Sequence, residues 1–372
     1  MTVNRLVALD MPASVEFADH VRKAWDSGDA VFPIDQRLPQ AAKDSLVEQF
    51  KPSVLIDRTG SVVNLLGSEP TEEGDALVIA TSGSTGAPKG VVHTHDSIRA
   101  LVNMSQARLR TDSSTHWLLC LPVSHVAGFS VLARSLVFGN PISILPKFDE
   151  SEVLAAAKSG ATHISLVPTT LNRIDPAIFE SILLGGAAAP PNLPANVTTT
   201  YGMTETFGGI VYNGIPLDGI HVRVADEHIE LQSPSLFRTY RGSKAQLSAE
   251  GWYETGDNGS FTNNVLQVFG RSDDMIITGG ENVWPIAVER VVSTIPGVER
   301  VVVRGIDDAQ WGQRVVAWIV SSNAVAPSLE KVRQHVKQQL PSFCAPTEIR
   351  IVNDIPTTSL GKVDFQALKN LW

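Results

Sequence analysis

Short apolar runs alternate with amphipathic segments along the first half of the chain. The apolar runs, each typical of a buried strand, lie at 53–56, 76–80, 117–122, 141–145, 163–167 and 181–184. Apolar residues at helical spacing predict helices over 14–30, 41–50, 97–109, 128–138 and 153–158. Strands that alternate with helices are typical of a doubly wound α/β layer, in which ligands bind at the carboxyl ends of the strands. We therefore expect binding groups in the segments that follow such strands, at 81–90, 122–128, 185–189 and 201–206.

The pattern changes near residue 220. Period-two alternation predicts a hairpin over 221–232, and 251–257 and 265–269 add further β structure. After a polar joint at 270–274 the helix and strand signals restart, with helices at 287–294 and 329–340 and strands at 298–304, 315–320 and 349–352. This pattern predicts a compact α+β unit of about one hundred residues. The boundary falls at 271–273, which gives an N-terminal domain of residues 1–271 and a C-terminal domain of residues 272–372.

One polar stretch, Thr81-Ser-Gly-Ser-Thr-Gly-Ala-Pro-Lys-Gly90, directly follows the buried run at 76–80. Its glycines allow successive backbone N–H groups to point toward one anion, and its hydroxyls and Lys89 add donors and positive charge. A polyphosphate is the ligand that suits these groups best. The stretch is not a Walker A motif, because two residues separate Gly86 from Lys89. The alternative interpretation is a solvated surface turn.

Composition narrows the range of partners. The 372 residues include 43% hydrophobic and 19% charged residues, with a formal net charge of −9. This acidic balance argues against a broad nucleic-acid-binding face, and no apolar run reaches the 18 residues of a membrane span. The two cysteines, Cys120 and Cys344, have no metal-like spacing, and we expect core thiols in a cytoplasmic protein.

Four further polar stretches, at 201–206, 253–257, 270–282 and 356–364, are each weak signals alone. Together and in this order, with 81–90, they resemble the acyl-adenylate-forming superfamily of acyl-CoA synthetases, peptide-synthetase adenylation domains and luciferases. The resemblance covers roughly residues 50–372. It implies a large α/β domain with layered sheets that holds ATP and an acid, and a small, mobile α+β lid. The phosphate stretch begins earlier than in most members, so the first subdomain is abbreviated. Short chains are typical of o-succinylbenzoate–CoA ligases, and 208–219 looks like their actinobacterial form.

The resemblance also implies residue roles. Glu205 is the expected Mg²⁺ ligand, Asp273 the hinge of the lid, and Lys362 the cation that neutralises charge as the acid carboxylate attacks phosphorus. Gly279 and Gly280 are expected to line the tunnel for coenzyme A. The expected ATP- and AMP-binding residues are Thr81, Ser82, Gly83, Ser84, Thr85, Gly86, Lys89, Gly185, Gly186, Ala187, Tyr201, Gly202, Thr204, Asp257 and Arg271. Structural alternatives remain open: a solvated Lys362, an exposed Glu205, and a surface ion pair between Asp257 and Arg271.

The acid is expected to meet His125, Arg134 and Gly208. His125 matches a gate between acid and coenzyme A, with a core histidine as the alternative. The helix that follows His125 is apolar on nearly every face except at Arg134, so we expect it to be buried. A buried guanidinium needs a partner. That partner is either structural, such as a core carboxylate or helix carbonyls, or the second carboxylate of o-succinylbenzoate.

The resemblance thus implies an ATP-dependent acid–CoA ligase that acts through an acyl-adenylate, with ATP, Mg²⁺ and coenzyme A, and o-succinylbenzoate is the expected acid. Its partners are small molecules, with neither nucleic acid nor a membrane span, and a homo-oligomer is possible. Other aryl- or acyl-CoA ligases, carrier-protein loaders and a non-catalytic acyl-AMP sensor remain alternatives. The identity of the acid does not follow from the sequence alone.

Overall fold

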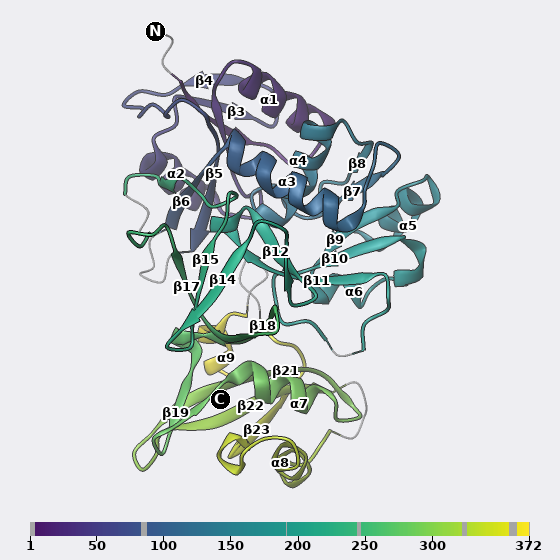
Figure 1. The fold of residues 1–372 in the computed structure, drawn as a ribbon, viewed down its shortest axis with the longest axis vertical. Helices are drawn as coiled ribbons and strands as arrows, with labels where there is room; N and C mark the ends of the chain where they lie inside the picture. The colour runs from purple at the N-terminus through teal and green to yellow at the C-terminus, as the bar shows by residue number, and fades with distance from the viewer. Residues whose placement is uncertain are drawn as a thin grey trace. The chain divides into compact units, whose positions relative to one another are not determined.

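The computed structural model describes residues 4–82, 88–190, 192–243, 247–321, 326–356 and 363–371. Contacts within the chain separate two units (Figure 1). The first comprises residues 1–189, 193–222 and 231–253, and the second comprises 190–192, 223–230 and 254–372. The predicted boundary after Arg271 falls inside the second unit, and the start of a mobile lid there stays a prediction.

The first sheet of the first unit has seven strands within the described residues. Their order is β16 (Thr239–Tyr240), β6 (Pro88–Thr94), β5 (Asp75–Ser82), β2 (Ala30–Pro33), β1 (Leu6–Asp10), β3 (Val54–Asp57) and β4 (Val62–Asn64). Strands β1, β2, β3 and β5 run parallel, whereas β4, β6 and β16 join antiparallel. The central strands β1 and β2 are buried because they are apolar along nearly their whole length.

The second sheet of this unit also has seven strands in the described part of the chain. Their order is β13 (Ile215–Pro216), β12 (Gly208–Tyr212), β11 (Val197–Met203), β10 (Ser181–Leu184), β9 (His163–Leu166), β7 (Trp117–Leu119) and β8 (Ile142–Ile144). The strands from β11 to β8 run parallel, and their apolar residues join those of α5 in one core cluster.

Helices cover these sheets. They are α1 (Val15–Asp26), α2 (Gln40–Phe50), α3 (His95–Leu109), α4 (Val126–Phe138), α5 (Glu150–Lys158) and α6 (Pro168–Leu171), with 3₁₀ turns η1 (Pro176–Ile178) and η2 (Thr204–Thr206). Helix α3 contacts β6 of the first sheet and β12 of the second, and it packs on α4. Helix α4 in turn contacts β7, β9 and β12. Residues of α3 and α4 are thereby brought next to the second sheet.

The second unit holds most of a four-stranded antiparallel sheet and a smaller α+β body. The sheet has the order β14 (His221–Ala225), β15 (His228–Gln232), β17 (Tyr253–Thr262) and β18 (Val265–Arg271). The remaining elements are η3 (Ser272–Asp274), β19 (Ile276–Thr278), β20 (Glu281–Val283), α7 (Pro285–Ser293), β21 (Val298–Asp308), β22 (Gly312–Ser321), α8 (Leu329–Lys337), η4 (Ser342–Cys344), β23 (Glu348–Val352) and α9 (Phe365–Lys369). Helices α7 and α8 bury their apolar stripes on β21 and β22.

The predicted α/β class is confirmed, and so are the two thiols, because Cys120 and Cys344 are buried and free. Three local predictions were wrong. The apolar segments β1 and β2 were missed. The strand β6, which pairs antiparallel with β5, was also missed. Helix α3 begins at His95, two residues before its predicted start at 97, because Thr94 caps it and Ser97 closes a capping box with Thr94.

Candidate functional site

The described ends of the phosphate stretch belong to the two paired strands β5 and β6. Thr81 pairs with Lys89 across the hairpin, and Ser82 pairs with Pro88. The Oγ1 of Thr81 donates a hydrogen bond to the backbone oxygen of Lys89, with an O–O distance of 3.4 Å. The exposed Lys89 ammonium lies 5.2 Å from the centre of the Tyr240 ring. The predicted residues Gly83, Ser84, Thr85 and Gly86 lie outside the described residues.

Glu205 is the central residue of η2, at the end of β11. Two neighbouring carbonyls of this turn accept hydrogen bonds: that of Thr204 from His93 Nε2 at 2.7 Å, and that of Glu205 from the N–H of Phe237 at 2.8 Å. The half-buried carboxylate accepts a hydrogen bond from the hydroxyl of Tyr240, 3.0 Å from its Oε1. Glu205 is therefore held in place through both its backbone and its side chain.

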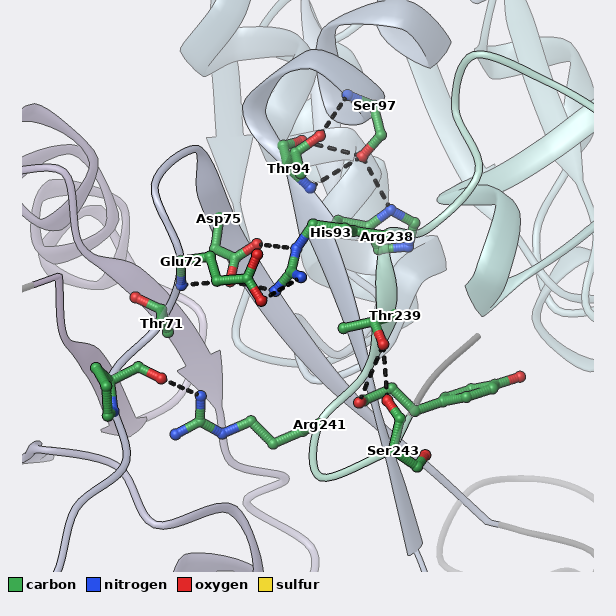
Figure 2. A network of polar contacts seen from close by, with 12 residues as sticks. Thr71, Glu72, Asp75, His93, Thr94, Ser97, Arg238, Thr239, Arg241 and Ser243 are labelled. Carbon is green, nitrogen blue, oxygen red and sulfur yellow. Dashed lines mark hydrogen bonds and ion pairs between the residues drawn. The ribbon is translucent and has the colours of Figure 1, made fainter. Parts of the chain in front are cut away.

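His93 is fully buried on β6 and fixes the start of this turn. A carbonyl only accepts hydrogen bonds, so Nε2 of His93 carries the proton. Burial lowers the pKa of His93 to about 4, although the bond to Thr204 opposes this shift. The other ring nitrogen, Nδ1, lies 3.2 Å from the hydroxyl of Ser97 (Figure 2). The imidazole is thus neutral at pH 7.

Gly202 lies where β11 and β12 approach most closely. The register of these antiparallel strands shifts between Tyr201 and Gly202. A Cβ at Gly202 would lie 1.9 Å from the backbone oxygen of Gly208, so a side chain cannot be accommodated there. The predicted adenine-binding residues Gly185 to Ala187 follow β10, and Tyr201 lies on the adjacent strand β11. The structure thus places these predicted residues at neighbouring strand ends.

His125 lies at the N-terminus of α4, and sequence reasoning missed both of its polar partners. Its Nε2 lies 3.3 Å from Oδ2 of Asp35 and 2.6 Å from Nη2 of Arg37. Arg37 also donates two side-chain hydrogen bonds to the buried Asp35 carboxylate. Burial opposes ionisation of Asp35, but hydrogen bonds from His125 and Arg37 outweigh it and hold the pKa of this carboxyl well below its usual range. The imidazole is therefore oriented by a permanently charged pair.

Arg134, on α4, is buried as predicted. Its Nη1 donates to the carbonyl of Ser130 at 2.7 Å, and its Nη2 donates to the hydroxyl of Ser105, on α3, at 2.8 Å. The guanidinium also lies 4.8 Å from the centre of the Trp117 ring. Burial lowers the pKa of Arg134, yet a guanidinium stays charged at pH 7. Among the described residues no carboxylate forms an ion pair with this cation.

Gly208 and Arg134 share one neighbouring residue, Ser130. A Cβ on Gly208 would lie 3.9 Å from the Cβ of Ser130, the residue whose carbonyl binds Arg134. The hydroxyl of Ser105 also lies 2.8 Å from that of Tyr212, on β12. Two of the three residues predicted to contact the acid, Arg134 on α4 and Gly208 on β12, therefore both lie next to Ser130.

In the second unit, Asp257 and Arg271 are cross-strand partners on β17 and β18. The distance between Oδ1 of Asp257 and Nη1 of Arg271 is 3.6 Å, and Asp257 is buried whereas Arg271 is exposed. Asp273 follows in η3, with its Oδ2 4.0 Å from Nη2 of Arg271. The three residues lie together in the structure, and their roles in ribose binding and as a hinge stay predictions.

Gly279 and Gly280 form the two-residue turn between β19 and β20. Their φ angles are +60° and +84°, and the flanking residues Thr278 and Glu281 pair across the hairpin. Positive φ at both central residues is the requirement of a type I′ turn, which glycine meets without strain. This gives a structural reason for both glycines, and their role in a tunnel stays a prediction. Lys362 lies outside the described residues.

No group of three or more histidine, cysteine or acidic side chains is arranged to hold a metal ion within the described part of the chain. A metal there would need ligands other than a protein cluster. No helix of the described residues has both the length and the apolar character needed to cross a membrane.

Two family models match the sequence. The model of AMP-binding enzymes matches residues 28–229, and that of the AMP-binding enzyme C-terminal domain matches residues 287–362. The chain belongs to the AMP-binding enzymes.

Two relatives of this AMP-binding enzyme are informative, one of them in two solved structures. A probable 2-succinylbenzoate–CoA ligase of Mycobacterium tuberculosis is 39% identical over 337 residues, which are 82% of this chain and 88% of the relative. The o-succinylbenzoate CoA synthetase of Bacillus subtilis, solved with its acyl-adenylate intermediate, has a TM-score of 0.83 and 25% identity, covering 98% of this chain and 88% of that one. The same synthetase solved with ATP and a magnesium ion has a TM-score of 0.84 at 25% identity, with 98% and 89% covered.

Sequence reasoning missed four residues that position this AMP-binding enzyme's candidate site. They are Asp35, Arg37, His93 and Tyr240, each of which contacts a predicted site residue or its turn. The histidine within the apolar part of β6 was the one local signal available. Asp35 and Tyr240 follow no motif, and only the tertiary fold brings them to their partners.

Proposed function

We propose that this chain is an AMP-forming 2-succinylbenzoate–CoA ligase of menaquinone biosynthesis. It converts 2-succinylbenzoate, ATP and coenzyme A into 2-succinylbenzoyl-CoA, AMP and pyrophosphate. The names of the similar ligases support this assignment. The observation that carries the choice of acid is the buried cation of Arg134, which has hydrogen-bond partners but no carboxylate among the described residues.

The charge of Arg134 explains why a diacid fits. Its contacts in the structure are a carbonyl, a hydroxyl and an aromatic ring, and none of these neutralises a full positive charge. A buried ion without a counter-ion is costly, whereas a substrate carboxylate would match the planar fork of the guanidinium. 2-Succinylbenzoate has two carboxylates. One attacks phosphorus, and we propose that the other is recognised by Arg134, directly or through water, beside Gly208.

The phosphates of ATP are assigned to Thr81, Ser82, Lys89 and the residues between them. Glu205 is the proposed ligand of Mg²⁺. A single carboxylate fits this ion, because Mg²⁺ usually takes one or two carboxylates and completes its shell with water and substrate phosphates. The absence of a larger acidic cluster within the described residues agrees with such a site. When bound, the ion supplies charge neutralisation on the phosphates.

The remaining roles are proposals of the same kind. Gly185, Gly186, Ala187 and Tyr201 flank the adenine, with Gly202 and Thr204 beside it, and Asp257 with Arg271 binds the ribose hydroxyls. His125, held by Asp35 and Arg37, lies between the acid and the path of coenzyme A. Lys362 serves the adenylation step. Movement of the lid about Asp273 then withdraws Lys362 and brings Gly279 and Gly280 to the tunnel through which the thiol of coenzyme A enters.

The decisive experiment is acid-dependent exchange of pyrophosphate into ATP, followed by thioester formation with coenzyme A. Two monoacid analogues are matched controls: 4-oxo-4-phenylbutanoate lacks the ring carboxylate, and 2-butanoylbenzoate lacks the chain carboxylate. We expect strong exchange with the diacid, weak exchange with the analogue that keeps the reacting carboxylate, and none with the other. Equal rates with the diacid and one monoacid would contradict the assignment. Pyrophosphate exchange without formation of a CoA thioester would indicate an enzyme that loads a carrier protein. The absence of exchange with every acid would indicate a non-catalytic sensor.

A second experiment separates the half-reactions. Lys362→Ala should abolish exchange yet form thioester from supplied acyl-adenylate, because charge neutralisation at the α-phosphate is needed only in the first step. Exchange at the wild-type rate would remove Lys362 from the mechanism.

A further inference from the structure

The turn that carries Glu205 is tied to one segment of the chain, residues 235–241. The N–H of Phe237 donates to the Glu205 carbonyl, and the hydroxyl of Ser235 donates to the Thr206 carbonyl at 3.1 Å. Tyr240 reaches the Glu205 carboxylate from the same segment, with a hydroxyl–Oε1 distance of 3.0 Å. This segment therefore holds both the backbone and the charge of the proposed metal ligand.

The same segment is bound to the strand of the phosphate hairpin. As β16 it pairs antiparallel with β6, with Tyr240 opposite Val91. On either side of β16, the N–H of Arg238 donates to the Val92 carbonyl and that of Arg241 donates to the Gly90 carbonyl. Tyr240 is therefore fixed in register with Lys89, which lies two residues before Val91 on β6.

Both ends of β16 are anchored by their arginine side chains. Figure 2 shows the guanidinium of Arg238 between Asp75 and Glu72, with N–O distances of 2.8 Å and 2.7 Å. The guanidinium of Arg241 donates to the carbonyls of Pro70 and Glu69. The strand has little freedom to slide, so the position of the Tyr240 side chain is set by the sheet.

Tyr240 is thus in contact with two opposite charges. Its hydroxyl binds Glu205, and its ring lies under the ammonium of Lys89. Glu205 and Lys89 form no ion pair with each other in the described part of the chain. A ring face attracts a cation, and a carboxylate oxygen that accepts one hydrogen bond keeps lone pairs for a hard cation. The Tyr240 hydroxyl is the donor in its bond to Glu205, because an ionised carboxylate only accepts hydrogen bonds.

We propose that Tyr240 is a positioning residue that sets Glu205 for the metal ion and Lys89 for the phosphates, and keeps these two groups apart before the nucleotide binds. The inference rests on the proposed function, since it takes Glu205 and Lys89 as parts of the Mg²⁺–ATP site. Groups that orient a metal ligand affect metal affinity by roughly 10- to 100-fold when removed.

The test is calorimetric binding of a non-hydrolysable ATP analogue at increasing Mg²⁺ concentrations. Tyr240→Phe removes only the hydroxyl, and we expect the Mg²⁺ concentration for half-maximal stimulation of binding to rise about tenfold. Metal-free nucleotide affinity should stay unchanged in this variant. Tyr240→Leu also removes the ring, and it should weaken metal-free nucleotide binding as well.

Tyr253→Phe is the matched control, because its hydroxyl lies 3.4 Å from that of Tyr240 in the same aromatic cluster. It should shift the Mg²⁺ requirement less than twofold. An unchanged Mg²⁺ requirement in Tyr240→Phe, or an equal shift in Tyr253→Phe, would overturn the inference. If the wild-type chain binds no nucleotide at any Mg²⁺ concentration, the proposed function itself fails, which is a separate result.

Discussion

Two arginines of the first unit show opposite solutions to the burial of a cation. Arg238 binds Asp75 through two nitrogens and Glu72 through a third, and its hydrogen bond to Asp75 raises its pKa. Arg134 is more deeply buried, has no carboxylate partner among the described residues, and has its pKa lowered by burial. One charge is neutralised within the fold, whereas we propose that the other is neutralised by a ligand.

This difference helps to distinguish a buried charge that stabilises the fold from a buried charge that binds a ligand. His93 is a useful third case, because it is as buried as Arg134 and also has no carboxylate partner in the described part of the chain. A histidine resolves this by losing its proton, whereas an arginine cannot. A permanent, unneutralised cation in a core is therefore the stronger indication of an anionic ligand.

From this comparison we expect the largest loss of folding stability when Arg238, the arginine with carboxylate partners, is substituted. Arg238→Met leaves the buried Asp75 carboxylate without its cation, and breaking such a pair typically costs roughly 3–5 kcal/mol. Urea unfolding followed by tryptophan fluorescence measures this change. The double variant Arg238→Met/Asp75→Asn should recover part of it. A decrease of less than about 1 kcal/mol in the free energy of unfolding would mean that the Arg238–Asp75 pair does not stabilise the fold as a buried ion pair.

His93 predicts a pH-dependent loss of stability. Its pKa is about 4 in the fold and about 6.5 when unfolded, so the unfolded chain binds more protons between these values. Stability from this residue is complete above pH 6.5 and falls as the pH drops toward 4, by roughly 3 kcal/mol in total. Urea midpoints between pH 7.5 and pH 4.5 measure the slope. His93→Gln should flatten it, and identical slopes would contradict the assignment of the shift to His93.

Substitution of Arg134 should weaken substrate binding and leave folding stability intact, which is the reverse of the effect expected for Arg238. Arg134→Met should raise the KM for 2-succinylbenzoate ten- to a hundredfold, since a charge-assisted hydrogen bond contributes about 1.5–3 kcal/mol. The KM for ATP should stay nearly unchanged, and the free energy of unfolding should not fall, because an apolar side chain replaces an uncompensated charge. Arg99→Met, at an exposed arginine on α3, is the control. Wild-type KM for the diacid in Arg134→Met would make the residue structural.

The smallest effect is expected at a residue that orients Arg134. Ser105→Ala removes the hydroxyl that accepts from Nη2 of the charged Arg134, but the hydrogen bond from Nη1 to the Ser130 carbonyl remains, so we expect an indirect loss of about 1 kcal/mol in binding of the diacid. We expect a roughly fivefold rise in the KM for the diacid without a change for the monoacid that lacks the recognised carboxylate. A parallel rise for both acids would show that Ser105 acts on packing alone.

Much of the fold could be predicted from local patterns. The alternation of apolar runs and helical spacing predicted most strands and helices of both units, because each run is buried on its own element. The strands β1 and β2 were missed because their short apolar runs lie beside a longer helical pattern. The pairing of β6 with β16 could not be inferred, since β16 comes almost 150 residues later in the chain.

The candidate site was predictable where a motif carries it. Lys89, Glu205, Asp257 and Arg271 belong to recurring stretches, and the structure brings the last two together across a hairpin. Tyr240 and Asp35 could not be inferred, because their bonds join residues 35 and 90 positions apart in the chain. The neutral state of His93 likewise depends on burial by distant elements. Sequence motifs identify the groups that we propose to contact a substrate better than the groups that hold them in place.

The pairing of β16 with β6 also bears on how the protein is made. Val91 emerges from the ribosome about 150 residues before its partner Tyr240, which corresponds to roughly 7–30 seconds of synthesis. During this interval the outer edge of β6 has no partner strand, and such edges promote aggregation. Substitutions in residues 238–241 should therefore lower the yield of nascent chains more than their effect on the finished protein suggests, and slower translation after residue 100 should make this worse.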